Sequence, residues 1–382
     1  MNRTQRQVLW TASASHGLIH VYELAVPALL ILIQKEFAVG DFSMGRIITV
    51  YGMLFGLGAL PAGFLVDRIG SRYLLVFCLW GSAAGVLGMA LSPSLVWFAV
   101  CAAFMGLCLS IYHPAGTSLL THSMPLSGKM FAFHGMAGNT GVATASVIAG
   151  TLGALFGWRW ALGLLALLGV VIGYRALGLP TPEQQEVRSR KGKGRWPDFA
   201  LLLIAILFMG VVYRGVTTFL PKFFATRLTD DAGSGTALGG LLTTLALLVG
   251  LAGIWAGGRL ADRGVSAPVL FLLGAAAQAP FLIALGYIAS PGLVPAAMGV
   301  AFFHFLTQPA GNYMVADFTP PRLRGLGYGV YFFMSFGAGS VGATLGGYIS
   351  ERAGLGQTFP VLALVLVPSV LAMLLLIYLR RR

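Results

Sequence analysis

Residues 63–72 read GFLVDRIGSR, and a shortened copy of this stretch, GRLADR, stands at residues 258–263. The same spacing aligns residues 113–116, HPAG, with residues 308–311, QPAG. A repeat at one constant spacing is typical of chains that duplicate a structural unit. The sequence therefore predicts two related halves.

The composition predicts a protein that is embedded in a membrane. Of the 382 residues, 57% are hydrophobic and only 10% are charged, whereas a soluble domain carries about 25% charged residues. Apolar runs of about 20 residues, the length that crosses a bilayer as a helix, recur along the whole chain. The twelve predicted spans are residues 10–33, 43–66, 73–91, 95–118, 130–154, 158–179, 198–225, 236–260, 267–289, 292–316, 325–350 and 357–379.

One polar stretch, residues 180–197, separates the sixth span from the seventh. Its sequence, PTPEQQEVRSRKGKGRWP, is rich in proline, glycine and charge, as expected of a linker. We therefore predict an all-α integral membrane protein with an N-terminal six-helix bundle at 1–179 and a C-terminal six-helix bundle at 198–382. In transporters built from such parallel repeats, the substrate site lies near the bilayer midplane between the repeats.

The basic residues predict the orientation in the membrane. If both termini are cytoplasmic, 18 of the 25 Lys and Arg residues lie on the cytoplasmic side. The opposite side then holds 6, which are Lys35, Arg46, Arg159, Lys222, Arg227 and Arg352. This bias follows the positive-inside rule. We expect a multi-pass protein of a bacterial cytoplasmic (inner) membrane, and the net charge of +13 then needs no nucleic-acid partner.

The stretch at 63–72 resembles the signature loop of the major facilitator superfamily, Gly-x-Leu-x-Asp-Arg-x-Gly-x-Arg, which joins spans two and three. The resemblance extends over essentially the whole chain, because the twelve spans and the second copy at 258–264 fit the same family. It implies the major facilitator fold and a secondary transporter that works by alternating access. An ordinary basic loop that only fixes topology is the alternative. The gating residues that the resemblance implies are Asp67, Arg68, Arg72, Asp262, Arg263 and Asp317.

A narrower resemblance concerns short polar motifs within the spans. The chain is similar to the fosmidomycin-resistance-type exporters at Ser15-His16, at the Gln34-x-Glu36-Phe37 end of span one and at 112–114, YHP. It departs from their pattern at His20 and His134. The resemblance implies a drug exporter that exchanges its substrate for protons.

Ionisable residues inside the spans are the candidates for the transport site, because a charge in the hydrocarbon layer is costly and usually faces a partner or a cavity. His16, His20 and Glu23 fall on one face of span one. Arg214 follows Tyr213 in span seven as Glu23 follows Tyr22 in span one, so Arg214 takes the pseudo-symmetric place of Glu23 if the first outer loop of the second half is four residues longer. We predict that Glu23 and Arg214 face one another across the cavity and that protonation of Glu23 favours switching of the halves. A static ion pair that holds the halves together is the alternative.

Further polar residues predicted to contact substrate or protons lie in spans four, five and ten. A histidine that precedes a proline in span four lies where the helix should kink, and a stripe at spacing four in span ten offers neutral hydrogen bonds. Each histidine can instead be a packing residue. These candidates are His113, His134, His304, Gln308 and Asn312.

Together these features predict proton-coupled export of a small anionic or amphiphilic organic molecule by a monomer without a cofactor. A lysophospholipid-type substrate is one alternative, and a sensor derived from a transporter is another. A divalent-metal exporter is a third, since His16, His20 and Glu23 present three possible ligands on one helical face. An enzyme is not predicted, because the sequence has no GxSxG motif, P-loop or paired catalytic carboxylates.

Overall fold

The computed structural model describes residues 1–124, 128–180, 194–288 and 292–381, and these ranges contain helices but no β-strand. Most of the predicted linker, residues 181–193, lies outside the described residues. The side chain of Asp67 also lies outside them.

The described residues of the N-terminal half form eight helices, because two of its six predicted spans are broken. The breaks divide the first and the fourth span. The helices are α1 (Arg3–Ala28), α2 (Leu30–Phe37), α3 (Asp41–Ile69), α4 (Ser71–Ala90), α5 (Leu95–Leu109), α6 (Tyr112–Ser123), α7 (Gly128–Phe156) and α8 (Trp158–Leu177).

The C-terminal half follows the same plan, with interruptions in its last two spans. Its eleventh span runs from α13 through a π-helical turn (Phe333–Gly337) and a 3₁₀ turn (Ala338–Ser340) into α14. The α-helices are α9 (Trp196–Leu228), α10 (Ala232–Asp262), α11 (Ala267–Tyr287), α12 (Leu293–Phe318), α13 (Arg324–Phe332), α14 (Val341–Ala353), α15 (Thr358–Val365) and α16 (Val367–Arg381).

Ten helical stretches in the described residues are long and apolar enough to cross a membrane, and two of them, 95–123 and 355–380, combine helices given separately above. The pair α1 and α2 is an eleventh if counted as one bent span. The predicted span at 325–350 falls outside this count. Its helical pieces nevertheless follow one another without a gap from Arg324 to Ala353. The all-α membrane fold predicted from the sequence is confirmed.

The bend between α1 and α2, 51°, has a local cause. Pro27 lies in the last turn of α1 and has no backbone N–H to donate to the carbonyl of Glu23. The hydroxyl of Tyr51 on α3 donates to this carbonyl instead, at 2.8 Å. A side chain from a neighbouring helix thus satisfies the backbone group that proline leaves free.

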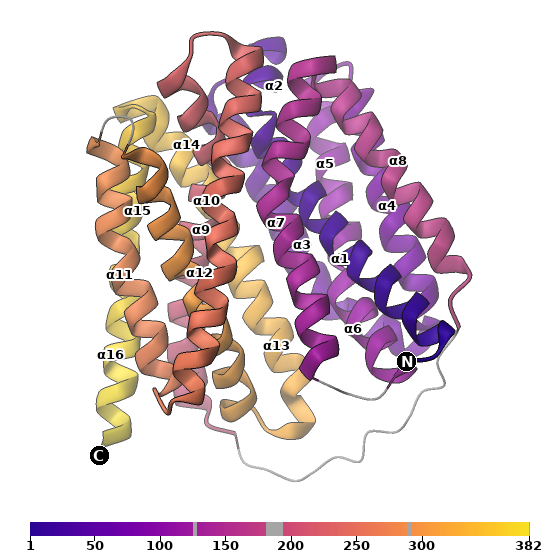
Figure 1. Ribbon diagram of the computed structural model, residues 1–382, viewed down its shortest axis with the longest axis vertical. Coiled ribbons are helices and arrows are strands. Elements are labelled where there is room, and N and C mark those ends of the chain that lie inside the picture. Colours follow the sequence, from indigo (N-terminus) through magenta and orange to yellow (C-terminus); the bar gives the residue numbers. More distant parts are fainter. Residues whose placement is uncertain (125–127, 181–193, 289–291, 382) are drawn as a thin grey trace.

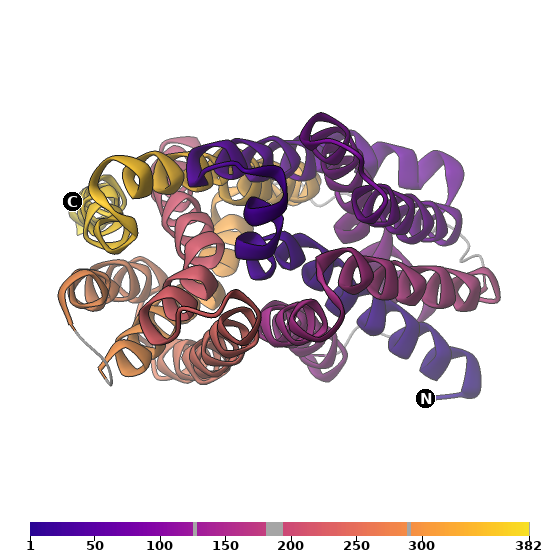
Figure 2. The ribbon, with the colours of Figure 1, turned by 90° about the horizontal axis from the view of Figure 1, so that it is seen from above.

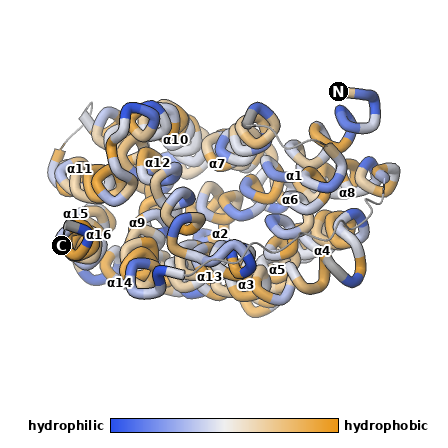
Figure 3. Tube along the Cα trace, turned by 90° about the horizontal axis from the view of Figure 1, so that it is seen from below, coloured by the Kyte–Doolittle hydropathy of each residue, from blue (hydrophilic) through white to orange (hydrophobic). Residues whose placement is uncertain are grey.

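The two halves lie side by side, and both termini lie at the same end of the molecule (Figures 1 and 2). Each half has its own hydrophobic core: one is built almost wholly from residues before 180, and the other from residues after 198. Apolar residues also occur around the outer perimeter (Figure 3), where many large hydrophobic side chains are exposed. This is the surface expected of a protein surrounded by lipid.

The halves meet along two helix pairs, α3 with α14 and α7 with α10. Glycines permit a close approach of the backbones in both pairs. A Cβ atom on Gly240 of α10 would collide with the carbonyl oxygen of Ser146 on α7, and one on Gly45 of α3 would collide with the carbonyl oxygen of Ala343 on α14. Small residues at such contacts are typical of packing between membrane helices.

Candidate functional site

A cavity of about 1070 Å³ lies between the halves. Its walls come from α3, α6 and α7 on one side and from α12, α13 and the π-helical turn on the other. Two of the helices that line it, α6 and α13, lie at the end of the molecule that carries both termini (Figure 1). Among the predicted site residues, those that line this cavity are His16, His113, His134 and Asn312.

The opposite end of the molecule is closed by a polar network around Asp41, the first residue of α3. One oxygen of Asp41 accepts from Nζ of Lys222 on α9 at 2.6 Å and from the amide of Gln34 on α2 at 2.8 Å. Its other oxygen accepts from the hydroxyl of Ser350 on α14 at 2.5 Å. We call Gln34, Asp41, Lys222 and Ser350 the outer network; it joins the two halves and was not predicted from the sequence.

The three histidines His16, His20 and His113 come together at the inner end of the cavity. The ring of His16 packs against Gly138 on α7, where a Cβ atom would leave no room for it. Its Nδ1 lies 3.0 Å from the carbonyl oxygen of His134, and the two imidazole rings are stacked with centroids 4.5 Å apart. One ring nitrogen from each of His16, His20 and His113 lies within 4.8 Å of the other two.

Glu23 links this cluster to the C-terminal half. One of its carboxylate oxygens pairs with Nδ1 of His20 at 2.8 Å, and the other pairs with Nη2 of Arg214. The side chains of Glu23 and Arg214 are each 1% exposed. The contact between Glu23 and Arg214 that the pseudo-symmetry predicted is therefore present, and it crosses the boundary between the halves.

The guanidinium group of Arg214 has hydrogen-bond donors that Glu23 does not use. Its Nε and Nη1 are buried and have no hydrogen-bond partner among the described residues. A buried, unpaired donor costs about 1–3 kcal/mol. These two nitrogens therefore keep donors that no described residue uses.

A layer of aromatic rings lies between the cavity and the ion pair. His113 stacks on Phe332 with ring centroids 5.4 Å apart and packs against Phe55 at 6.0 Å. Phe336, from the π-helical turn, contacts both His113 and Tyr213, the residue that precedes Arg214. Rings from both halves therefore pack together at the wall of the cavity.

The polar stripe predicted on span ten is divided among three environments. His304 stacks on Tyr213 with centroids 5.1 Å apart, and both line a small cavity inside the C-terminal half with the buried Gln278. Asn312 lines the large cavity, whereas Gln308 is exposed and lines neither. The structure does not bring Gln308 to the histidine cluster.

A family comparison identifies the chain. The model described as Major Facilitator Superfamily matches residues 18–343 and also residues 228–382. The chain belongs to the major facilitator superfamily.

Transporters of this superfamily with curated names align with nearly the full chain. A D-galactonate transporter of Escherichia coli O6:H1 is 22% identical, with 90% of this chain and 89% of the relative covered. The sialic acid transporter NanX of E. coli K12 is 24% identical, with 93% and 90% covered. The human voltage-gated purine nucleotide uniporter SLC17A9 is 24% identical, with 90% and 86% covered. The resemblance to fosmidomycin-resistance-type exporters stays a prediction.

Solved structures of the superfamily share the fold. A bacterial homologue of the human lysosomal transporter Spinster, in an inward-facing and unoccupied conformation, superimposes with a TM-score of 0.82 at 16% identity, covering 98% of this chain and 97% of that one. A peptide transporter POT in complex with sulfate gives a TM-score of 0.78 at 15% identity, covering 98% and 94%.

Among the superfamily signature residues whose side chains the structure describes, none joins the halves in this conformation. Arg68 lies over the ring of Phe64, and Arg72 donates to the carbonyl of Leu179 at 2.9 Å. Asp317 pairs with Arg195 and Arg380, both in the C-terminal part of the chain. Asp262 and Arg263 are exposed. The gating role of these residues stays a prediction.

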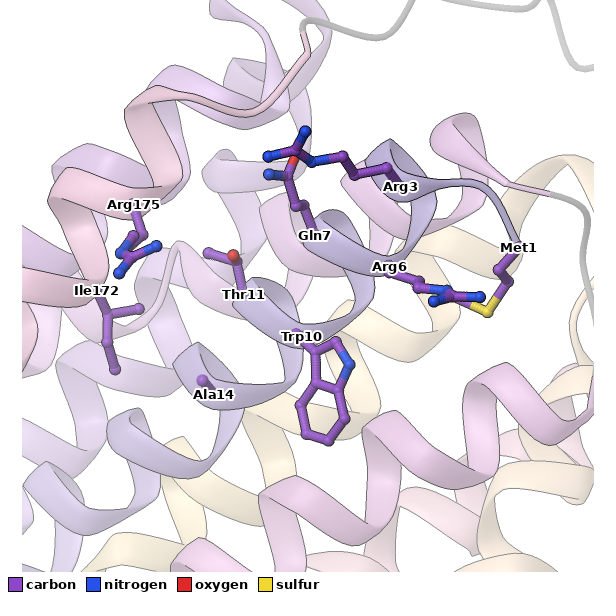
Figure 4. Close-up of a pocket in the computed structure, with 9 residues that line it drawn as sticks. All are labelled: Met1, Arg3, Arg6, Gln7, Trp10, Thr11, Ala14, Ile172 and Arg175. Atoms are coloured by element: carbon purple, nitrogen blue, oxygen red, sulfur yellow. The ribbon is translucent and has the colours of Figure 1, made fainter.

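A second cavity of about 710 Å³ lies between the N-terminal turns of α1 and helix α8 (Figure 4). Arg3, Arg6 and Arg175 line it together with the exposed Trp10, and its lining residues include no acidic side chain. This second cavity shares no lining residue with the cavity between the halves.

Proposed function

We propose that this protein is a secondary active transporter of a small organic anion, and that Arg214 binds the anionic group of the substrate. The observation that carries the proposal is the pair of buried, unpaired nitrogens, Nε and Nη1, on Arg214. The Nε–H shares one edge of the planar guanidinium group with Nη2, and Nη1 shares the other edge with Nη2, the nitrogen that pairs with Glu23. A carboxylate can accept from either edge through both of its oxygens if it shares Nη2 with Glu23 or displaces Glu23 from it.

The charge balance of the site supports the same proposal. Glu23 is the carboxylate that faces Arg214, and it shares its negative charge with His20. A second anion at Arg214 would therefore compete with Glu23 or share the guanidinium with it. Competition of this kind would weaken the contact between the halves and favour a change of conformation.

The named substrates of the relatives agree with this chemistry. D-galactonate and sialic acid are organic acids, and purine nucleotides carry phosphate groups. All three carry an anionic group attached to a polar, hydroxylated body. We therefore propose that the substrate of this chain is a hydroxylated organic acid, and the experiment below identifies which acid.

Proton coupling follows from the charge of such a substrate. Moving one elementary charge across 100 mV changes the free energy by about 2.3 kcal/mol, so the uptake of a lone anion by a cell with a negative interior is opposed. A proton carried in the same direction removes this cost. The sequence predicts export in exchange for protons. Export would use the same residues for the substrate and the proton, but the substrate would move out of the cell while protons move in.

We also propose that the termini are cytoplasmic and that the protein acts as a monomer in a bacterial inner membrane. With this orientation, the cavity of about 1070 Å³ opens to the cytoplasm and the outer network closes the other side. The structure then corresponds to the cytoplasm-facing state of an alternating-access cycle.

The test is a measurement in liposomes with D-galactonate, sialic acid and other hydroxylated acids as candidates, each in the presence of EDTA. The informative variant is Arg214→Lys, because lysine keeps the charge but loses the planar edge. We expect it to lower the initial transport rate at least tenfold for the accepted acid. Arg159→Lys, at a half-exposed ion pair with Glu36, is the matched control and should transport normally.

A pH-sensitive dye inside the same liposomes reports the direction of coupling. Acidification that accompanies uptake of the acid indicates symport, whereas acidification that accompanies its release indicates exchange. Transport by Arg214→Lys at the wild-type rate would contradict the proposal that Arg214 binds the anion.

A further inference from the structure

The histidine cluster has features that transport of an organic anion does not explain. Three imidazole rings, two from α1 and one from α6, bring one nitrogen each to within 4.8 Å of one another. Such a group of nitrogens with no cation between them is unfavourable, because lone pairs face lone pairs or buried N–H groups stay unpaired. Nε2 of His113 is in fact buried without a partner among the described residues.

The hydrogen bonds of His16 and His20 set the tautomers of their rings. Nδ1 of His16 lies 3.0 Å from a backbone carbonyl oxygen, and Nδ1 of His20 lies 2.8 Å from a carboxylate oxygen of Glu23. Both oxygens can only accept, so each Nδ1 carries the proton and donates it. In the neutral ring, Nε2 then keeps its lone pair.

This arrangement is the one that metal-binding histidines use in proteins. A histidine ligand almost always donates its second ring N–H to a carboxylate or a backbone carbonyl, which fixes the ring and makes the ligating nitrogen more basic. His20 has the carboxylate and His16 has the carbonyl. His113 adds a third ring, whose Nε2 is buried and has no hydrogen-bond partner among the described residues.

We propose that His16, His20 and His113 bind a divalent transition-metal ion of the zinc, cobalt and nickel class. Three neutral imidazoles favour this class over magnesium or calcium, which prefer oxygen ligands. The sequence analysis considered a metal site with Glu23 as the third ligand. The structure instead gives that place to His113 and makes Glu23 the residue that orients His20.

The distances are compatible with a site that closes around an ion. Nitrogens bound at 2.0–2.1 Å in a tetrahedral site are about 3.4 Å apart, so the most distant pair must approach by about 1.4 Å. All three ligands belong to the N-terminal half, so this movement requires small rotations of the rings without a change in the position of the halves.

The site is open to the cavity rather than sealed in the core. His16 and His113 both line the cavity, so an ion can enter and leave through it. A fourth coordination position would face the cavity and accept water or a carboxylate. The site therefore has the form of an exchangeable metal site, in which three protein ligands leave one position open.

The first test is equilibrium binding of Zn²⁺ to the full-length protein, purified in detergent on an affinity tag without histidines. We expect one ion per protein, and a weaker affinity by at least 100-fold in each of His16→Gln, His20→Gln and His113→Gln. His122→Gln is the matched control: His122 is exposed at the mouth of the same cavity and should leave the affinity unchanged. Binding of Co²⁺ should give the intense visible absorption of a tetrahedral site.

Glu23→Gln separates the orienting role from a ligand role. Loss of such a hydrogen-bond partner typically weakens metal binding 10- to 100-fold, less than the loss of a ligand. Because this variant leaves Arg214 without its carboxylate, its folding is checked first by size-exclusion chromatography. A shift of the melting temperature by Zn²⁺ in wild-type protein and its absence in His113→Gln gives a second readout that does not depend on Glu23.

Two results would overturn the proposal: wild-type protein that binds no Zn²⁺ at micromolar concentrations, or a His113→Gln variant that binds it as tightly as wild type. Neither result bears on Arg214, because the transport assay for organic anions is run in EDTA. The metal site and the proposed transport function can therefore fail separately.

Discussion

Glu23 on α1 and Arg214 on α9 form an ion pair that joins the two halves of the protein, and both side chains are 1% exposed. Removal of one partner from a buried pair leaves an uncompensated charge and typically costs 3–5 kcal/mol. We therefore expect Glu23→Leu and Arg214→Met each to lower the thermal stability of the purified protein strongly. The double variant should regain most of the lost stability but should not transport.

Thermal unfolding in detergent and transport in liposomes check this prediction together. The double variant distinguishes the two roles considered for the pair. If it transported as well as wild type, the pair would be only a structural contact. If either single variant were as stable as wild type, the burial of the pair in the protein would be contradicted.

The sequence carried enough information to predict this contact. The repeat of GFLVDRIGSR at 258–263 related the halves, and the relation placed Arg214 opposite Glu23. The same reasoning predicted the fold, because span length and the repeat depend only on composition and spacing. The faces of single helices were also predictable, as the grouping of His16, His20 and Glu23 on α1 shows.

What the sequence could not predict depends on neighbouring helices. It did not show that His113 of α6 approaches His16 and His20, since no pattern within one helix records the position of another. It treated Lys222 as an external basic residue, although Lys222 pairs with Asp41 across the halves. The available signal for the outer network was the presence of polar residues near the ends of three predicted spans, namely Gln34, Asp41 and Lys222.

The outer network should stabilise the state that the structure describes. Asp41 is 6% exposed and receives hydrogen bonds from α2, α9 and α14. Asp41→Asn keeps the size of the side chain but loses the charge that holds Lys222. We expect it to shift the equilibrium toward the state that is closed at the terminal end by about fivefold, or ~1 kcal/mol.

Labelling of a cysteine at the cavity mouth measures this shift. Thr117, which is exposed and lines the cavity, is replaced by cysteine in a background without Cys78, Cys101 and Cys108. A membrane-impermeant maleimide applied from the terminal side should label the Asp41→Asn protein more slowly than its parent. Equal or faster labelling would show that the network does not hold the outer side closed.

Two glycine substitutions, one inside and one outside the contact between α7 and α10, should affect stability differently. A Cβ atom on Gly240 would collide with the carbonyl oxygen of Ser146, whereas one on Gly163 of α8 has no atom within 4 Å. Gly240→Ala should destabilise the protein by about 1–3 kcal/mol through overpacking. Gly163→Ala should leave the stability unchanged or raise it slightly, since alanine favours a helix. Thermal unfolding of both variants measures the two changes in stability. If Gly163→Ala destabilised the protein and Gly240→Ala did not, the close packing of α7 against α10 would be contradicted.

The bend after α1 predicts a coupling between Pro27 and Tyr51. Tyr51→Phe removes the hydroxyl that donates to the carbonyl of Glu23 at 2.8 Å, and an unsatisfied buried carbonyl costs about 1–3 kcal/mol. Pro27→Ala supplies a backbone N–H at the position from which an α-helix would reach the same carbonyl. The loss of stability caused by Tyr51→Phe should therefore be smaller in a protein that already carries Pro27→Ala.

A double-mutant cycle on thermal stability measures this coupling. The two substitutions act on one acceptor, so their effects should fail to add by about 1 kcal/mol. Strict additivity would mean that the hydroxyl of Tyr51 does not replace the bond that proline removes. The carbonyl belongs to Glu23, so transport by the Pro27→Ala variant shows in addition whether the bend is needed to set the position of the Glu23–Arg214 pair. We expect a lower transport rate in Pro27→Ala even where its stability is unchanged, because a straightened α1 would move the backbone that holds the carboxylate.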